Sequence, residues 1–383
     1  MFIVNWISMW PELMYFINRG DIRDRYFVLK YLSLSRYYLS NFKMNRQRTT
    51  YIIALFFVLL CVLSTSCKDK QLHPDVSSIE VELNVIPFYQ EFGAIDTLNV
   101  ETDIQPIIEK YPQFMQAYSR QIVKLGSTDN PEYYKRTYDF LTYDANKDIF
   151  KKAGDIFSDH QQFSSDLEEG FKHYKYYFKD VNVPDVYLMV SGFSQSIAVD
   201  SAWVGVSIEK YLGEDCEFYE WLNIPKYLRK GMTKEKMASD VIRAMALTNY
   251  TYDTGVNDLI NNMVYKGKVR YFVHRMFPDL QDSLLFDYSA EQIHWCQKNE
   301  DNMWASMVEW KHIFSNDRML IQKYTGDAPF TANFGNNSAP RAGEYIGYKI
   351  VESYMKNNEE ITLKDLMEEQ DGRKILAASR YRP

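Results

Sequence analysis

Cysteine, proline and glycine are scarce in this chain of 383 residues, and long hydrophobic runs are missing. There are 4 Cys, 12 Pro and 16 Gly. Four cysteines are too few for a disulfide-stabilised scaffold, and so little Gly and Pro argues against collagen-like, linker-rich and turn-rich all-β proteins. The apolar runs stay below the roughly 18–20 residues that a membrane-spanning helix needs. These scarcities favour an ordinary globular chain.

Basic residues are not in excess either: acidic residues outnumber them, and the formal net charge is −7. A nucleic-acid partner is therefore not favoured. Apolar residues, by contrast, make up 46% of the chain and aromatic residues 16%, with 30 Tyr and 23 Phe. That share fills a sizeable core and excludes intrinsic disorder for most of the length. The length allows one large domain or two ordinary ones.

The segment from Met44 to Cys67 has the pattern of a secretory signal. Arg46 and Arg48 precede an apolar run over 51–63, and three small residues then lead into Cys67. A charged start, a short apolar core and small residues at the cleavage position are typical of such signals. A Cys in this place resembles the cleavage box of bacterial lipoproteins, which implies lipid attachment to Cys67. Acyl chains would hold the protein at a membrane by about 0.8 kcal/mol per methylene. A secreted protein without lipid and an uncleaved anchor are the alternatives.

The position of this signal predicts the organisation of the chain. A signal peptide acts from the N-terminus, so residues 1–43 are expected to be a misassigned extension. Residues 44–66 are then the signal peptide, 67–78 a short tether and 79–383 a single domain. The extension and the signal together hold eight Lys or Arg and three Asp or Glu, so their removal leaves a net charge of −12. Such an acidic body does not adhere to anionic lipid, and the acyl chains alone are expected to anchor it.

Local patterns predict an α+β fold that is mostly α-helical and contains a small antiparallel sheet. Apolar and polar residues alternate over 79–85, which predicts a half-buried strand. Apolar, β-rich runs predict three further strands at 186–190, 196–199 and 202–208. Helical spacing covers 113–180 and most of 232–383, ending in one helix over 362–379. Four capping boxes are expected to begin helices, namely Thr102 with Gln105, Ser165 with Glu168, Ser289 with Gln292, and Thr362 with Asp365.

Two of the four cysteines remain once the signal and the lipid are assigned. Cys61 leaves with the signal peptide and Cys67 carries the lipid, so Cys216 and Cys296 are left. In an oxidising envelope these two can form a disulfide. Two buried free thiols are the alternative, and the sequence spacing does not decide between them.

The familiar catalytic and metal-binding motifs do not occur in the sequence. It contains no His-Glu-x-x-His, paired Cys-x-x-Cys, Walker loop or Gly-x-Gly-x-x-Gly. The run Gly192–Ser196 lacks the second Gly of a nucleophile elbow and is expected to be a polar turn between strands. Asp144, Asn146 and Asp148 begin like a calcium loop, but the Gly at position six and the Glu at position twelve are missing. We expect these three residues at the N-terminus of a helix.

Two Glu-x-x-His pairs are interpreted as solvated helix faces. Glu291 with His294 and Glu309 with His312 have the spacing found in di-metal helix bundles. The pairs are about 27 Å apart on one predicted helix, so they cannot share a metal. The aromatic side chains at helical spacing over 174–178 are expected in the core rather than on a glycan-binding surface. The sequence therefore predicts neither a metal nor any other cofactor.

Four stretches of the chain carry a resemblance to a known family, namely Phe171–Pro184, Val204–Gly213 with Ile224–Tyr227, Ala328–Thr331, and Ser338–Pro383. Together with the lipid-attachment pattern, they resemble the gliding-motility lipoprotein GldB family over most of 67–383. Glu209 stands where the family pattern suggests Asp. The resemblance implies a cell-envelope lipoprotein on the periplasmic face of the outer membrane. It also implies a non-catalytic accessory role, with the membrane and other envelope motility or secretion proteins as partners.

The family is in turn similar to zinc-peptidase folds of the gluzincin type, in a degenerate form. The helix that would carry His-Glu-x-x-His corresponds to 235–247, where Asp240 and Arg243 occur but no His. Arg270 stands where a later helix would supply a Glu ligand. Zinc needs three protein ligands and an open position, so a dead metal centre is implied. Asp240, Arg243 and Arg270 are instead predicted to form a structural ion-pair cluster. A ligand- or glycan-binding lipoprotein and a metallopeptidase-like hydrolase remain the alternative functions.

Overall fold

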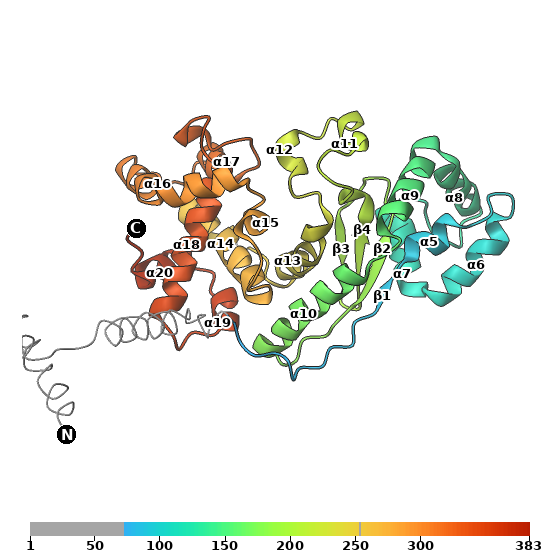
Figure 1. The fold of residues 1–383 in the computed structure, drawn as a ribbon, viewed down its shortest axis with the longest axis horizontal. Coiled ribbons are helices and arrows are strands. Elements are labelled where there is room, and N and C mark those ends of the chain that lie inside the picture. The colour runs from blue at the N-terminus through green and yellow to red at the C-terminus, as the bar shows by residue number, and fades with distance from the viewer. Residues whose placement is uncertain (1–72, 253) are drawn as a thin grey trace, which may run out of the picture. The chain divides into compact units, whose positions relative to one another are not determined.

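The computed structural model describes residues 73–252 and 254–383. The predicted extension, the signal peptide, the lipid-attachment residue Cys67 and the start of the tether lie outside the described residues. The described residues form one compact unit. Within the described residues, no helix combines the length and the apolar composition that a membrane crossing requires. The unit is mostly helical with one small sheet, which confirms the predicted α+β class (Figure 1).

The sheet has four strands in the spatial order β1-β2-β4-β3. The strands are β1 (Val85–Ile86), β2 (Asp185–Met189), β3 (Ile197–Val199) and β4 (Trp203–Ser207). Only β3 and β4 pair antiparallel, whereas β1 with β2 and β2 with β4 are parallel. The expected all-antiparallel arrangement is therefore corrected to a mixed sheet. Strands β3 and β4 form a hairpin, and β3 lies at the edge of the sheet. Strand β4 lies between β3 and β2 and runs parallel to β2.

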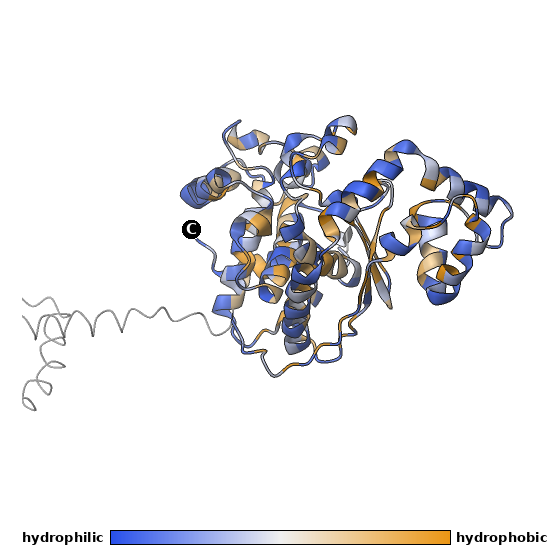
Figure 2. Cartoon of the chain, turned by 45° about the vertical axis from the view of Figure 1, so that its right-hand side comes forward, coloured by the Kyte–Doolittle hydropathy of each residue, from blue (hydrophilic) through white to orange (hydrophobic). Residues whose placement is uncertain are grey.

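Both faces of the sheet are buried, and alternate residues belong to two different cores. Val186, Leu188, Val204 and Val206 belong to the larger core, whereas Tyr187, Met189 and Trp203 belong to the smaller one. This follows from the two-residue period of a strand, which turns successive side chains to opposite faces. Burial on both faces also explains why the strand sequences are continuous apolar runs. The strands are accordingly mostly orange, the colour of hydrophobic residues, in Figure 2.

The extended chain before β1 follows the predicted alternation without forming a strand over its whole length. Ile79, Val81, Leu83 and Val85 are half-buried while the residues between them are exposed. Ladder pairing is confined to Val85–Ile86, beside β2. The period of the sequence thus predicted burial correctly, whereas strand pairing depended on a partner about 100 residues later in the chain.

A layer of N-terminal helices covers the face of the sheet that belongs to the smaller core. The helices are α5 (Phe88–Gly93), α6 (Val100–Lys110), α7 (Pro112–Ala117), the π-turn η1 (Tyr118–Ile122) and α8 (Glu132–Thr142). The next helix, α9 (Asp144–Phe157), buries Ile149, Ala153 and Phe157 in the larger core instead. Aromatic rings make up much of the packing in the smaller core, and the ring of Phe114 stacks on Tyr187 at a centroid distance of 3.9 Å. Offset and edge-on ring pairs of this kind stabilise a core beyond the area they bury.

The opposite face of the sheet belongs to the larger core, and the chain continues through helices that lead into the C-terminal half. They are α10 (Gln161–Tyr177), α11 (Glu217–Trp221), α12 (Lys226–Arg229), α13 (Met237–Asn249) and α14 (Leu259–Met276). Then follow α15 (Asp282–Phe286), α16 (Ala290–Glu309), α17 (Arg318–Thr325), α18 (Ala342–Asn357), α19 (Leu363–Glu368) and α20 (Gly372–Ser379). Short 3₁₀ turns lie between them at η2 (Ile208–Lys210), η3 (Lys234–Lys236), η4 (Thr254–Val256) and η5 (Ala332–Phe334).

Two of the four predicted capping boxes form. Ser289 with Gln292 begins α16, and Thr362 with Asp365 begins α19. The other two predictions are wrong, because α6 already begins at Val100 and α10 at Gln161. The predicted helix over 362–379 is two helices, since the Asp371 side chain accepts hydrogen bonds from the Arg373 and Lys374 amides and begins α20 anew.

Two glycines allow α14 and α18 to approach until their backbones touch. A Cβ on Gly267 would collide with the backbone of Gly347, and a Cβ on Gly347 would collide with the carbonyl of Met263. Arg270 lies one turn after Gly267, and Glu344 lies one turn before Gly347. The close contact therefore brings these two charged side chains face to face inside the protein.

Candidate functional site

A cavity of about 930 Å³ opens beside the edge strand and is lined by many charged groups. Its walls come from the start of β3, η2, the α12 region, α13, α14, the end of α17 and the start of α18. The volume lies in the range of small-molecule binding sites. The charged residues in its lining are Lys210, Asp240, Arg243, Lys266, Arg270, Asp287, Asp327, Arg341 and Glu344.

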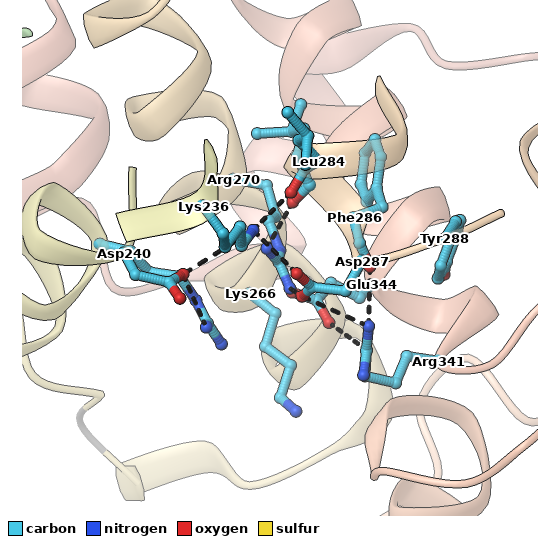
Figure 3. Close-up of polar contacts among 12 residues, drawn as sticks. Lys236, Asp240, Lys266, Arg270, Leu284, Phe286, Asp287, Tyr288, Arg341 and Glu344 are labelled. Atoms are coloured by element: carbon cyan, nitrogen blue, oxygen red, sulfur yellow. Dashed lines mark hydrogen bonds and ion pairs between the residues drawn. The ribbon is translucent and has the colours of Figure 1, made fainter. Parts of the chain in front are cut away.

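Arg270 is the centre of an ion-pair network at the floor of this cavity (Figure 3). Its side chain is only 2% exposed. The Nε atom donates to Oε1 of Glu344 at 2.6 Å, and Nη2 lies 3.2 Å from Oδ2 of Asp287. Nη1 donates to the carbonyl of Leu285. Every nitrogen of the guanidinium therefore has an acceptor inside the fold.

Two further cations complete the network around the same carboxylates. Nζ of Lys236 lies 2.9 Å from Oδ1 of Asp287, and Nε of Arg341 lies 3.4 Å from Oε2 of Glu344. Arg341 also pairs with Asp327 through Nη1 at 2.9 Å. Because Nη2 of Arg341 also lies 3.6 Å from Oδ2 of Asp287, Asp287 is held by three cations and Glu344 by two. Multiple partners of this kind are what allow charged groups to stay ionised when buried.

The balance between burial and these cations sets the pKa values of the carboxylates. Burial acts to raise the pKa of Glu344, but Arg270 and Arg341 outweigh it and lower the pKa to about 2. Lys236 and Arg270 likewise hold the pKa of Asp287 below its ordinary value, against the effect of burial. Asp240 behaves differently, because burial raises its pKa and the nearby cations do not compensate.

We expect the stability of the protein to fall in acid through these carboxylates. A lowered folded pKa contributes stability that is present above the unfolded value near 4.5 and is lost as the pH falls towards about 2. Urea unfolding between pH 7 and pH 3 measures this loss. Glu344→Gln should make the acid dependence shallower, whereas Glu368→Gln, in an exposed ion pair with Lys364, should keep it. An unchanged slope in Glu344→Gln would contradict the assignment.

The three residues predicted from the sequence all line the cavity, but they do not all contact one another. Nη1 of Arg243 lies 3.9 Å from Oδ1 of Asp240, one turn away on α13. The ion pairs of Arg270 are instead with Asp287 and Glu344. Sequence reasoning did not single out these two carboxylates or the cations at positions 236 and 341. A charged residue in the otherwise small and apolar start of α18 was the available signal for Glu344.

The other candidate positions have structural roles. His294 is exposed on α16, and His312 lies beyond the end of that helix, where its ring shares a hydrogen bond with the Tyr324 hydroxyl at 2.9 Å. Asp144 begins α9, as expected for a helix N-terminus. Gly192 occupies a turn between strands with φ at 65°. Among the residues described, no three His, Cys, Asp or Glu side chains converge as metal ligands would.

The two remaining cysteines are both buried and free. Cys216 and Cys296 are not joined, so of the two open alternatives the structure has the free thiols. Burial raises the pKa of both thiols. A protonated, buried thiol behaves as a small apolar side chain, and neither is placed to act as a nucleophile.

Glu209, which departs from the expected Asp, has a structural role at the end of β4. Its Oε1 atom accepts hydrogen bonds from the Ser191 amide at 2.8 Å, the Ser191 hydroxyl at 2.7 Å and the Phe193 amide at 3.0 Å. These bonds fasten the loop after β2 to the turn after β4. Burial nevertheless raises the pKa of Glu209.

Comparison with known proteins adds the last observation. No curated protein and no solved structure matches the chain. The family model described as gliding motility protein GldB matches residues 69–383, which include the sheet, both cores and every residue of the cavity. The chain therefore belongs to the GldB family of gliding motility proteins.

Proposed function

We propose that this protein is a lipid-anchored, non-catalytic accessory component of the cell envelope that serves gliding motility and the associated protein secretion machinery. The family match over residues 69–383 carries the association with motility. Lipid attachment at Cys67 is proposed from the signal and cleavage pattern of the sequence. The partners are then the membrane, through the lipid, and other envelope proteins of the same machinery, on the periplasmic face of the outer membrane.

The chemistry of the cavity supports a non-catalytic role. Among the described residues that line it there is no His and no Cys. The buried carboxylate of Asp287 is engaged by three cations and that of Glu344 by two, so neither is free to act as a general base. Arg270 lies between them, and its positive charge disfavours a second cation such as a metal ion. The cluster is thus suited to holding α14, α15 and α18 together.

The lipid anchor is tested with Cys67→Ala in a deletion strain of a gliding host. We expect the parent protein to incorporate labelled palmitate and to sediment with membranes. Cys67→Ala should lose the label, leave the membrane fraction and fail to restore gliding, because the acyl chains are the proposed anchor. Cell fractionation, label incorporation and colony spreading are the measurements.

Cys61→Ala is the matched control, since it removes a sulfur from the apolar run of the signal without touching the cleavage position. This variant should behave like the parent. A Cys67→Ala protein that stays with the membranes would contradict the anchor. Full gliding with a released protein would contradict the need for anchoring while leaving the family assignment intact.

A further inference from the structure

Three cations line the cavity outside the ion-pair network. They are Lys210 in η2, Arg243 in α13 and Lys266 in α14, so three separate elements bring them to one space. The region as a whole holds more cations than carboxylates. The lining holds five cations, Lys210, Arg243, Lys266, Arg270 and Arg341, and four carboxylates, Asp240, Asp287, Asp327 and Glu344.

Within the described part of the chain, Lys210 and Lys266 have no ion pair within 4.0 Å, and Arg243 has a single long one. Nζ of Lys266 donates to the carbonyl of Thr325, and no described carboxylate lies within 4.0 Å of it. Arg243 has its one ion pair in the described part of the chain at 3.9 Å, and its Nε atom is buried without a hydrogen-bond partner. Nζ of Lys210 lies 5.3 Å from the ring centre of Phe193.

The carboxylates of the cavity each lie closer to another cation than to Lys210, Arg243 or Lys266. Asp287 and Glu344 are held by the network, and Asp327 is 2.9 Å from Arg341. Asp240 accepts a hydrogen bond from the Tyr211 hydroxyl at 3.2 Å and faces Lys236 at 3.7 Å. The positive charges of Lys210, Arg243 and Lys266 are therefore only partly balanced by the carboxylates of the cavity.

Burial disfavours the charged forms of the two lysines of this set. Burial lowers the pKa of Lys266, and the like charges of Arg341 and Arg243 lower it further against the pull of Glu344 and Asp327. Burial also lowers the pKa of Lys210, against the opposing pull of Glu209. Partly buried cations without partners cost free energy, and an anion placed among them removes that cost. In Figure 3 the amino group of Lys266 points away from the carboxylates drawn there.

We infer that the cavity is a binding site for a small, multiply charged oxyanion ligand, a phosphate ester or a polycarboxylate, held by Arg243 and Lys266 with Lys210 adding attraction. The planar guanidinium of Arg243 suits two oxygens of one such group. Apolar side chains around the charged patch would contact the rest of the ligand, including Ile197, Ile224, Tyr227, Leu228 and Leu247.

The inference is tested by calorimetric titration of the full chain in a neutral detergent with inorganic phosphate and with citrate. We expect saturable binding of one or both, and the better ligand distinguishes a phosphate site from a carboxylate site. Arg243→Gln and Lys266→Met should each weaken binding about tenfold or more, because each removes a charge-assisted hydrogen bond. Lys364→Met, in an exposed pair with Glu368, is the matched control and should bind like the parent.

A second measurement does not depend on the folding of any variant. Acetylation of lysines in the parent protein, followed by mass spectrometry, should slow at Lys210 and Lys266 when the bound anion is present, while Lys364 reacts unchanged. Absence of saturable binding by both anions would overturn the inference. Binding that is equally tight in Arg243→Gln and Lys266→Met, with no protection of either lysine, would overturn it too.

Discussion

Replacing Arg270 with Met should lower the free energy of unfolding by about 3–5 kcal/mol, the range for breaking a buried ion pair by removing one partner. The side chain is 2% exposed and is bound to both Glu344 and Asp287. Met fills a similar space but leaves Glu344 with Arg341 alone and the Leu285 carbonyl without its donor. Urea unfolding at pH 7, followed by tryptophan fluorescence, measures the loss.

Two controls separate this effect from a general sensitivity to substitution. Lys364→Met removes an exposed pair at 3.8 Å and should change stability by no more than about 0.5 kcal/mol. Arg270→Met combined with Glu344→Met should cost less than the two single changes added together, because the double variant strands no carboxylate at position 344. A loss below about 1 kcal/mol in Arg270→Met would show that the network is not a buried structural element.

Gly347→Ala should lower the free energy of unfolding by about 3 kcal/mol or more, at the upper end of the cost of overpacking a core. The added Cβ would collide with the carbonyl of Met263. A backbone atom cannot rotate away, so α14 and α18 must separate, and the separation also stretches the bond between Arg270 and Glu344. Urea unfolding and near-ultraviolet circular dichroism measure the loss of stability and of aromatic packing.

Gly154→Ala is the matched control for this prediction. Gly154 lies inside α9, where an added Cβ meets nothing within 4 Å in the described part of the chain. Ala favours a helix over Gly by roughly 0.5–1 kcal/mol, so this variant should be slightly more stable than the parent. A Gly347→Ala protein with the stability of the parent would contradict the backbone contact between the two helices.

Local features of the fold were predictable because their causes are local. Ser289 with Gln292 begins α16 as expected, since both groups of the capping box lie within one turn. The alternation over 79–85 correctly indicated which side chains are half-buried. The same kind of reasoning failed at Ser165, because the helix begins at Gln161 without a side-chain cap at His160.

The cavity was only partly predictable. The resemblance to zinc-peptidase folds drew attention to Asp240, Arg243 and Arg270, and all three line one space. It did not reveal which carboxylates hold Arg270, because Glu344 is 74 residues further along the chain. The overall composition, with a net charge of −7, also gave no sign that cations outnumber carboxylates in the lining of the cavity.

The amino-acid sequence was enough to predict the helical α+β class and the family, since each depends on residues close together or on an ordered set of short stretches. Export and lipid attachment at Cys67 stay predictions from the same kind of local pattern. The folded chain was needed for the mixed order of the strands, the glycine contact between α14 and α18 and the partners of Arg270. These features depend on groups that come into contact only when distant segments of the chain pack together. Short-range periodicity carries no information about which distant segment packs against a given helix or strand.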